Sequence, residues 1–135
     1  MKTLFSLSIL LFCLSAHAEV AVIVHPSNAS SADALLIKRI FEGQLKSFSD
    51  GSSAIPISQT ADLPAAEEFN SKVLKKTASQ LKAYWAKIVF TGKGSPPNEV
   101  NNDAEVIKLV STNPNLVGYV DASAVNSSVK VLATF

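Results

Sequence analysis

The chain has 135 residues, a formal net charge of +1 at pH 7 and 17% charged residues. This balance argues against nucleic acid as a partner, because binding along a phosphate backbone needs a concentrated positive surface. One cysteine and two histidines are too few for a disulfide framework or for a zinc or copper site of the usual composition. We therefore expect no metal and no cofactor.

Residues 1–18 are typical of a cleavable secretory signal peptide. Lys2 supplies the positive start, residues 4–14 form an apolar run, and small residues surround the expected cleavage point. Removing 18 of the 135 residues leaves 117, residues 19–135, as one periplasmic domain of a Gram-negative bacterium, with no membrane insertion. A lipoprotein signal ending at Cys13 is the alternative, which the large residue before the cysteine disfavours.

The domain is expected to begin with a central strand at Val20–Val24, because a continuous β-branched run suits a strand that is buried on both faces. Pro26 then starts a turn, since proline cannot donate to a sheet ladder. Ser30 or Ser31 is expected to cap the helix that follows. Gly43 suits the position just after its end. The apolar stripe of this helix is Leu36, Ile37, Ile40 and Phe41.

A second strand and a second helix are expected in the next part of the chain. Residues 54–58 alternate in polarity, and Pro56 marks them as an edge strand or the beginning of a strand. A helix is predicted over residues 64–74, with Thr60 or Asp62 as its cap.

The stretch 74–97 should contain a long amphipathic helix around which the other elements are organised. Thr77 is well placed as its N-cap, and the domain is expected to cover its apolar stripe, with Tyr84 and Trp85 in the core. The members of the stripe follow the 3.6-residue period: Leu81, Tyr84, Trp85, Ile88 and Val89.

The remaining chain should contribute one helix and two strands. A loop over residues 92–102 precedes a helix that is capped by Asp103 and ends before Asn113. Buried strands are expected at residues 116–120 and 129–132. The predicted fold class is α/β, with a small mixed sheet flanked by about four helices.

Three segments of the chain carry a resemblance to a known family. They are RIFEGQLKSFSDG at Arg39–Gly51, AYWAKIVFTGKGSPP at Ala83–Pro97 and VSTNPNLVGYV at Val110–Val120. In this order they resemble small exported members of the phosphate ABC transporter substrate-binding protein family. The resemblance implies a single lobe of the type II periplasmic binding protein fold. It also implies that the chain binds phosphate or another small oxyanion and works with an ABC permease.

The chain departs from this family at the residues that hold the anion. Family members use an arginine and a Ser-Gly-Thr motif at a helix N-terminus, which bind the anion through N–H groups and hydroxyls. Gln59 stands at the arginine position, and Leu63, Pro64 and Ala65 stand at the Ser-Gly-Thr positions. Proline has no N–H, and leucine and alanine have no hydroxyl. The alternative function is therefore a periplasmic interaction module that has lost anion binding and contacts another protein or forms a homodimer.

Ligand sites in α/β sheets gather at strand ends, so the candidate site lies beside the helix that begins near residue 64. No catalytic constellation accompanies it, because the chain has no G-x-S-x-G turn and one histidine after the signal peptide, so we expect no enzyme. The candidate ligand-binding residues are Ser58, Gln59 and Thr60, faced by Ser27 and Asn28 from the turn after the first strand.

Overall fold

Strand β1 (Val20–Val24) occupies the interior of the sheet, between β4 (Leu116–Asp121) and β5 (Lys130–Thr134), and pairs antiparallel with both. All five β1 residues are buried, which confirms the prediction from the β-branched run. The computed structural model describes residues 18–135. The predicted signal peptide therefore lies almost wholly outside the described residues.

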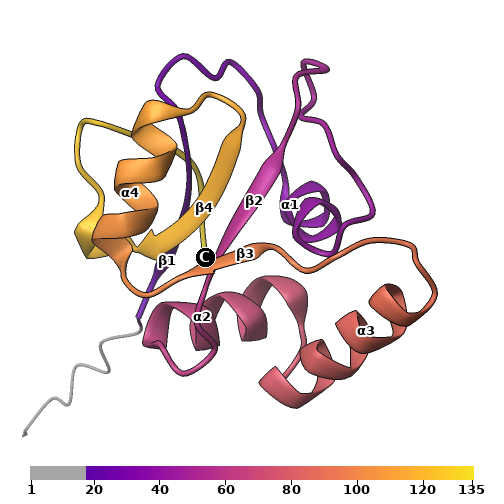
Figure 1. The fold of residues 1–135 in the computed structure, drawn as a ribbon. Coiled ribbons are helices and arrows are strands. Elements are labelled where there is room, and N and C mark those ends of the chain that lie inside the picture. The colour runs from indigo at the N-terminus through magenta and orange to yellow at the C-terminus, as the bar shows by residue number, and fades with distance from the viewer. Residues whose placement is uncertain (1–17) are drawn as a thin grey trace, which may run out of the picture.

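The sheet has five strands in the order β3-β2-β4-β1-β5 (Figure 1). Strand β2 (Ile55–Gln59) is parallel to β4 on one side and to the short β3 (Asn98–Val100) on the other. Pro56 pairs with β4, but the β3 pairing starts only at Ile57, so the proline lies where β2 has no neighbour on its β3 side. Its predicted place at a strand beginning is confirmed.

Helices cover both faces of this sheet. Helix α1 (Ala34–Phe41), helix α2 (Pro64–Phe69) and its π-helical continuation η1 (Asn70–Leu74) pack on one face, and α4 (Asp103–Thr112) packs on the other. Figure 1 shows α4 and α1 on opposite sides of the strands. The five-stranded mixed sheet and its helices confirm the predicted α/β class.

The two faces of β1 contribute to two separate cores. Val20, Val22 and Val24 join the core under α1 and α2, whereas Ala21 and Ile23 join the core under α4. This alternation follows from the two-residue period of a strand. A short 3-10 turn at Ala122–Ala124 joins β4 to the segment before β5.

Helix α3 (Ala78–Phe90) is attached to the rest of the domain by one edge. The predicted Thr77 cap is confirmed as a full capping box with Gln80. The prediction that the domain covers the whole apolar stripe is wrong, because only Trp85 is buried in this helix and Val89 is 53% exposed. Figure 1 shows why: α3 lies beside α2 and away from the sheet.

Two other helix starts differ from the predictions by a few residues. Asp33 caps α1 and accepts a hydrogen bond from the Leu36 N–H, so the predicted Ser30 or Ser31 cap is wrong. Asn102 caps α4 in the same way, one residue before the predicted Asp103. Short polar side chains compete for such positions, and the one with the extended backbone becomes the cap.

Strand β3 lies inside the predicted loop 92–102, which is a correction. Three residues, two of them exposed, carry no clear alternation of polarity, so the sequence offered no signal for this edge strand. The predicted last strand at 129–132 is confirmed with shifted bounds as β5, but it lies at the edge of the sheet and none of its residues is buried. Among residues 18–135, none of the helices combines the length and the apolar character needed to cross a membrane.

Candidate functional site

The carboxyl end of β2 is organised around the hydroxyl group of Tyr119, which comes from the neighbouring strand β4. Tyr119 is fully buried, and its Oη atom lies 2.9 Å from Ser58 Oγ and accepts a hydrogen bond from the Gln59 N–H at 3.0 Å. Burial raises the pKa of the Tyr119 phenol, and the hydrogen bonds from Ser58 and the Gln59 backbone oppose that rise only in part. The phenol therefore acts as a neutral structural group.

Gln59 is part of the same internal network. Its side chain is buried, and Nε2 donates to Asp103 Oδ1 and to the Tyr119 carbonyl, both at 2.8 Å. An amide nitrogen has two N–H groups, so both donors are occupied within the protein. Gln59 ties β2 to α4 and β4, and it has no donor left for a ligand, although sequence reasoning placed it in the candidate site.

The start of α2 offers few groups that could bind an anion. Leu63 is its N-cap and makes no side-chain hydrogen bond, so the predicted capping by Thr60 or Asp62 is wrong. Pro64 occupies the first helical turn and has no N–H. Thr60 is half-buried and lies directly before this turn, where its N–H donates to the Val100 carbonyl.

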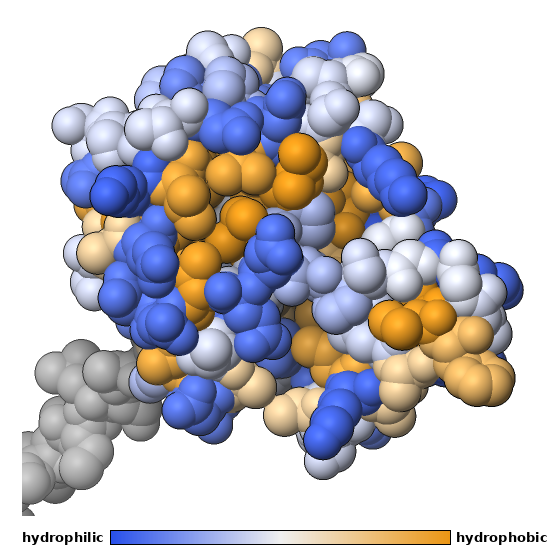
Figure 2. Space-filling view, in the orientation of Figure 1, coloured by the Kyte–Doolittle hydropathy of each residue, from blue (hydrophilic) through white to orange (hydrophobic). Residues whose placement is uncertain are grey.

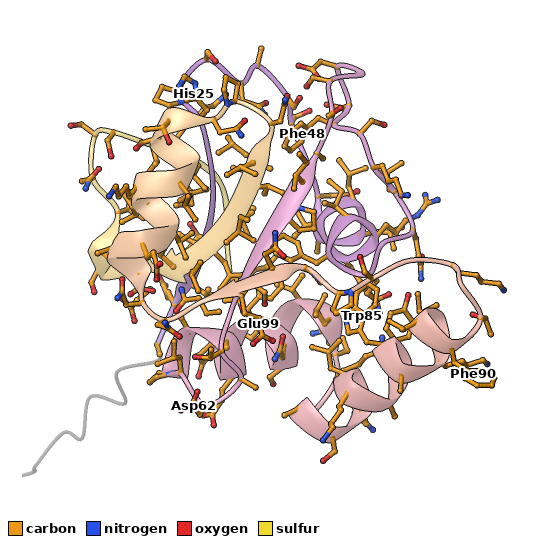
Figure 3. The ribbon with its side chains drawn as sticks, in the orientation of Figure 1. His25, Phe48, Asp62, Trp85, Phe90 and Glu99 are labelled. Atoms are coloured by element: carbon orange, nitrogen blue, oxygen red, sulfur yellow. The ribbon has the colours of Figure 1, made fainter. Side chains whose placement is uncertain are left out.

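The turn after β1 lies at the other end of the sheet. β1 is antiparallel to β4, so Val24 pairs with Val117 near the start of β4, and the start of β2 pairs there too. Ser27 and Asn28 therefore do not face Ser58–Thr60, and this part of the site prediction is wrong. Figure 3 shows His25, beside the turn, at the opposite end from Asp62. The prediction assumed parallel strand ends, but β1 runs the other way.

Ser27 and Asn28 are engaged in local turn contacts. Ser27 Oγ lies 2.7 Å from His25 Nδ1. Asn28 is 6% exposed, and its Oδ1 accepts a hydrogen bond from the Ser30 N–H, while its carbonyl accepts one from Lys130. These hydrogen bonds account for the positions of Ser27 and Asn28 as parts of a locally stabilised turn.

Carboxylates gather at the end of the sheet where β2 and β4 finish. Asp103 Oδ1 accepts hydrogen bonds from Gln59 and from the Asp121 N–H, and Glu99 pairs with Ser58 in the β2–β3 register. The Ser123 hydroxyl and N–H lower the pKa of Asp121 by donating to its carboxylate. Among the described residues, no group of three or more His, Cys, Asp or Glu side chains could hold a metal ion.

A cavity of about 430 Å³ opens between α3 and the body of the domain. Of the candidate ligand-binding residues, only Ser58 lines this cavity. The buried residues Asn70 and Trp85 line it as well. Figure 3 shows Trp85 reaching from α3 towards the body of the domain, with Glu99 on the neighbouring strand. A second hollow of about 470 Å³ adjoins it and shares Trp85.

Sequence reasoning missed Asn70, although a signal was available. It occupies a helical stretch whose other inward positions, such as Phe69 and Val73, are apolar. A single polar residue on an otherwise apolar helix face is the pattern to look for, because a buried amide needs a partner or a ligand.

Comparisons with protein-family models and with curated proteins gave no match. Solved structures of phosphate transport proteins are similar in fold. The structure of a protein described as a phosphate ABC transporter substrate-binding protein, from Clostridium perfringens and with bound phosphate, aligns with a TM-score of 0.62 at 20% identity. PstS from Borrelia burgdorferi aligns with a TM-score of 0.61 at 14% identity. An ABC-type phosphate transport receptor from Vibrio cholerae gives 0.57 at 16%.

These alignments cover most of this chain but less than half of each solved structure. The shares are 85% of this chain and 45% of the Clostridium protein, 86% and 47% for the Borrelia protein, and 85% and 46% for the Vibrio protein. The fold is therefore that of a single lobe of the periplasmic binding protein type. At these identities the likeness concerns the fold alone.

Proposed function

We propose that this chain is an exported solute-binding-type protein that serves ABC import and takes phosphate or another small oxyanion as its ligand. The observation that carries the proposal is the fold, which matches a phosphate-bound structure over 85% of the chain. Proteins of one fold often differ in function, so the proposal depends on a test of binding.

The ligand would lie beside Ser58 and Thr60, at the point where β2 ends. Ser58 contributes a hydroxyl group, and the half-buried Thr60 side chain has no hydrogen-bond partner among the described residues. Hydroxyl groups suit an oxyanion because they donate without adding charge. Neighbouring Asp62 and Glu99 would repel a dianion, so a singly charged oxyanion fits this end of the sheet better.

Isothermal titration of residues 19–135 with phosphate, at low and at physiological salt, tests the proposal. We expect saturable heat that weakens as salt increases. Thr60→Val should weaken binding about tenfold, because a hydrogen bond to a charged group is lost. Thr134→Val, an exposed threonine on β5, is the matched control and should change nothing. A folded protein that gives no heat above dilution contradicts the proposal.

The second candidate is a protein-interaction module that keeps the lobe and has lost the anion. The lack of a side-chain cap at Leu63, the missing N–H of Pro64 and the internal use of Gln59 favour it. Phe90 of α3 is 92% exposed. Figure 2 shows apolar atoms at the margin of the molecule where Figure 3 labels Phe90.

Sedimentation velocity over a range of concentrations tests the simplest form of this second function, a homodimer. A dimer that Phe90→Ser dissociates would support it, because large exposed apolar side chains are uncommon on monomeric surfaces outside interaction sites. A monomer at all concentrations that also binds phosphate would reject it.

A further inference from the structure

The cavity beneath α3 contains a polar group that the protein itself leaves without a partner. Asn70 is 6% exposed and lines the cavity, and no hydrogen bond joins its side-chain amide to any of the described residues 18–135. Its backbone groups are engaged: the N–H donates to the Ala66 carbonyl, and the carbonyl accepts from the Lys75 and Lys76 N–H groups. Among residues 18–135, Ser30 Oγ is the only fully enclosed side-chain N or O atom without a partner, so the Asn70 amide reaches the open space of the cavity, where it can pair with a bound molecule.

Ser58 supplies a second polar group to the same cavity. The hydroxyl of Tyr119 is completely buried and accepts the Gln59 N–H, so its own proton has Ser58 Oγ as the one acceptor within reach at 2.9 Å. If Tyr119 donates to Ser58, the Ser58 O–H points away from that bond. Because Ser58 lines the cavity, this proton is available to a ligand there.

Most of the remaining cavity lining is apolar or aromatic, and Ser79, Lys82 and Glu99 are its other polar residues. Phe41 and Trp85 are buried rings from α1 and α3, and Leu74 and Leu81 close the sides. The rings can contact a flat aromatic molecule, a favourable arrangement when rings are offset or edge-on. The volume of about 430 Å³ lies within the range of about 300 to 1,000 Å³ typical of small-molecule sites.

The charges at the mouth of the cavity balance. Lys82 of α3 and Glu99 of β3 both line it, and both are exposed. One cation and one anion give no net preference for a charged ligand, and solvent screens both groups. The Asn70 amide can accept and donate at the same time, which selects a ligand that carries a donor beside an acceptor.

We propose that this cavity is a binding site for a small neutral aromatic amide, whose ring lies among Phe41, Trp85 and the leucines. The amide of the ligand pairs with the Asn70 side chain, and its carbonyl also accepts from Ser58. The site shares Ser58 with the proposed oxyanion site, but its other contacts come from the cavity under α3 and not from Thr60 or the start of α2.

Benzamide is the probe, and Trp85 is the reporter because it is the only tryptophan of the chain. Titration of residues 19–135 should change the Trp85 fluorescence saturably, and the side-chain NH₂ signals of Asn70 should shift in ¹⁵N–¹H spectra. Toluene keeps the ring without the amide and should bind at least about tenfold more weakly. Because phosphate would compete for the Ser58 hydroxyl, the two proposals are distinguished by Asn70→Leu, which should abolish benzamide binding and leave the phosphate titration unchanged.

Asn70→Leu should abolish benzamide binding without unfolding the protein, because no side-chain hydrogen bond to residues 18–135 is lost and leucine is apolar like the neighbouring inward positions. Its melting temperature should equal or exceed that of the natural chain. Asn115→Leu, an exposed position at the other end of the sheet, is the control and should bind normally. Ala78→Phe fills the cavity from α3 and should also block binding, independently of the Asn70 substitution.

Two results would overturn the proposal. The first is the absence of any saturable change in the Trp85 or Asn70 signals at millimolar benzamide in a folded protein. The second is equal affinity for toluene and benzamide, because the Asn70 amide would then have no part in recognition. Retained benzamide binding in Ala78→Phe would likewise place the ligand elsewhere.

Discussion

Gly118 of β4 lies directly against Val106 of α4: a Cβ atom added to Gly118 would stand 2.5 Å from Val106 Cγ1. No real Cβ contact is that short, and Val106 is fully buried, so the helix would have to move. The close approach of α4 to the sheet therefore depends on the missing side chain at this position.

Gly118→Ala should lower the free energy of unfolding by roughly 1–3 kcal/mol, since it overpacks a closed interface. Urea denaturation measures the change. Gly94→Ala is the control, because a Cβ there would meet only Ile88 Cγ2 at an ordinary 3.5 Å. Equal stability of the two variants would show that α4 can shift without cost.

Phe69→Ala should be among the most destabilising single changes in the chain. Its ring stacks on Tyr119, with centroids 4.0 Å apart and planes 8° from parallel, and lies 4.6 Å from the Phe41 ring. Removing it should cost roughly 3–5 kcal/mol, because a large cavity remains in the core. Phe90→Ala removes the same side chain from a 92% exposed position and should leave the denaturation midpoint unchanged.

Stability should fall at alkaline pH, and Tyr119 should account for part of the fall. Burial raises its pKa above the ordinary value of 10.0, so the folded protein holds the phenol proton more tightly than the unfolded chain does. This contribution is complete below pH 10.0 and is lost as the pH rises towards the folded-state pKa. Denaturation at a series of alkaline pH values measures the slope.

Tyr119→Phe should make that slope shallower, whatever its effect on stability at neutral pH. Part of the slope should remain, since the hydrogen bond to Glu42 raises the pKa of Lys38 and gives a contribution of the same sign. Lys38→Met should remove the second part. An unchanged slope in Tyr119→Phe would mean that the phenol does not titrate with unfolding.

Thr77→Ala should weaken α3 more than the rest of the fold. The substitution removes the side-chain half of the capping box, at a cost of about 1 kcal/mol. Faster hydrogen exchange confined to the amides of residues 78–90 is the expected result, because α3 buries only Trp85. Ser79→Ala, at an exposed position in the same helix, should leave the exchange rates unchanged.

The sequence was sufficient to predict the elements whose patterns are local. The buried runs that became β1 and β4, the Thr77 cap and the end of α4 before Asn113 all follow from propensity and periodicity. Pairing direction is different, because it depends on contacts between segments that are far apart in the sequence. The antiparallel direction of β1 was therefore not predicted, and the position of Ser27, which depends on that direction, was predicted wrongly.

The candidate site could be predicted only in part for a similar reason. Ser58 and Thr60 do lie at a strand end, as strand-end reasoning requires. The role of Gln59 is set by Asp103 and Tyr119, which come from two later elements, and no local pattern reveals those partners. The cavity exists because α3 contacts the domain along one edge and buries only Trp85. Hydrophobic periodicity alone overestimates how many residues of such a helix are buried.

Both neighbours of β1 are made from the last part of the chain: β4 begins at Leu116 and β5 ends at Thr134. A nascent chain therefore has no neighbouring strand for β1 before it reaches Leu116. Loop closure over so many residues makes folding slow compared with that of a locally connected domain. The pairing of β1 is therefore one of the last contacts that the sheet can form, after the residues of the intervening helices have already been made.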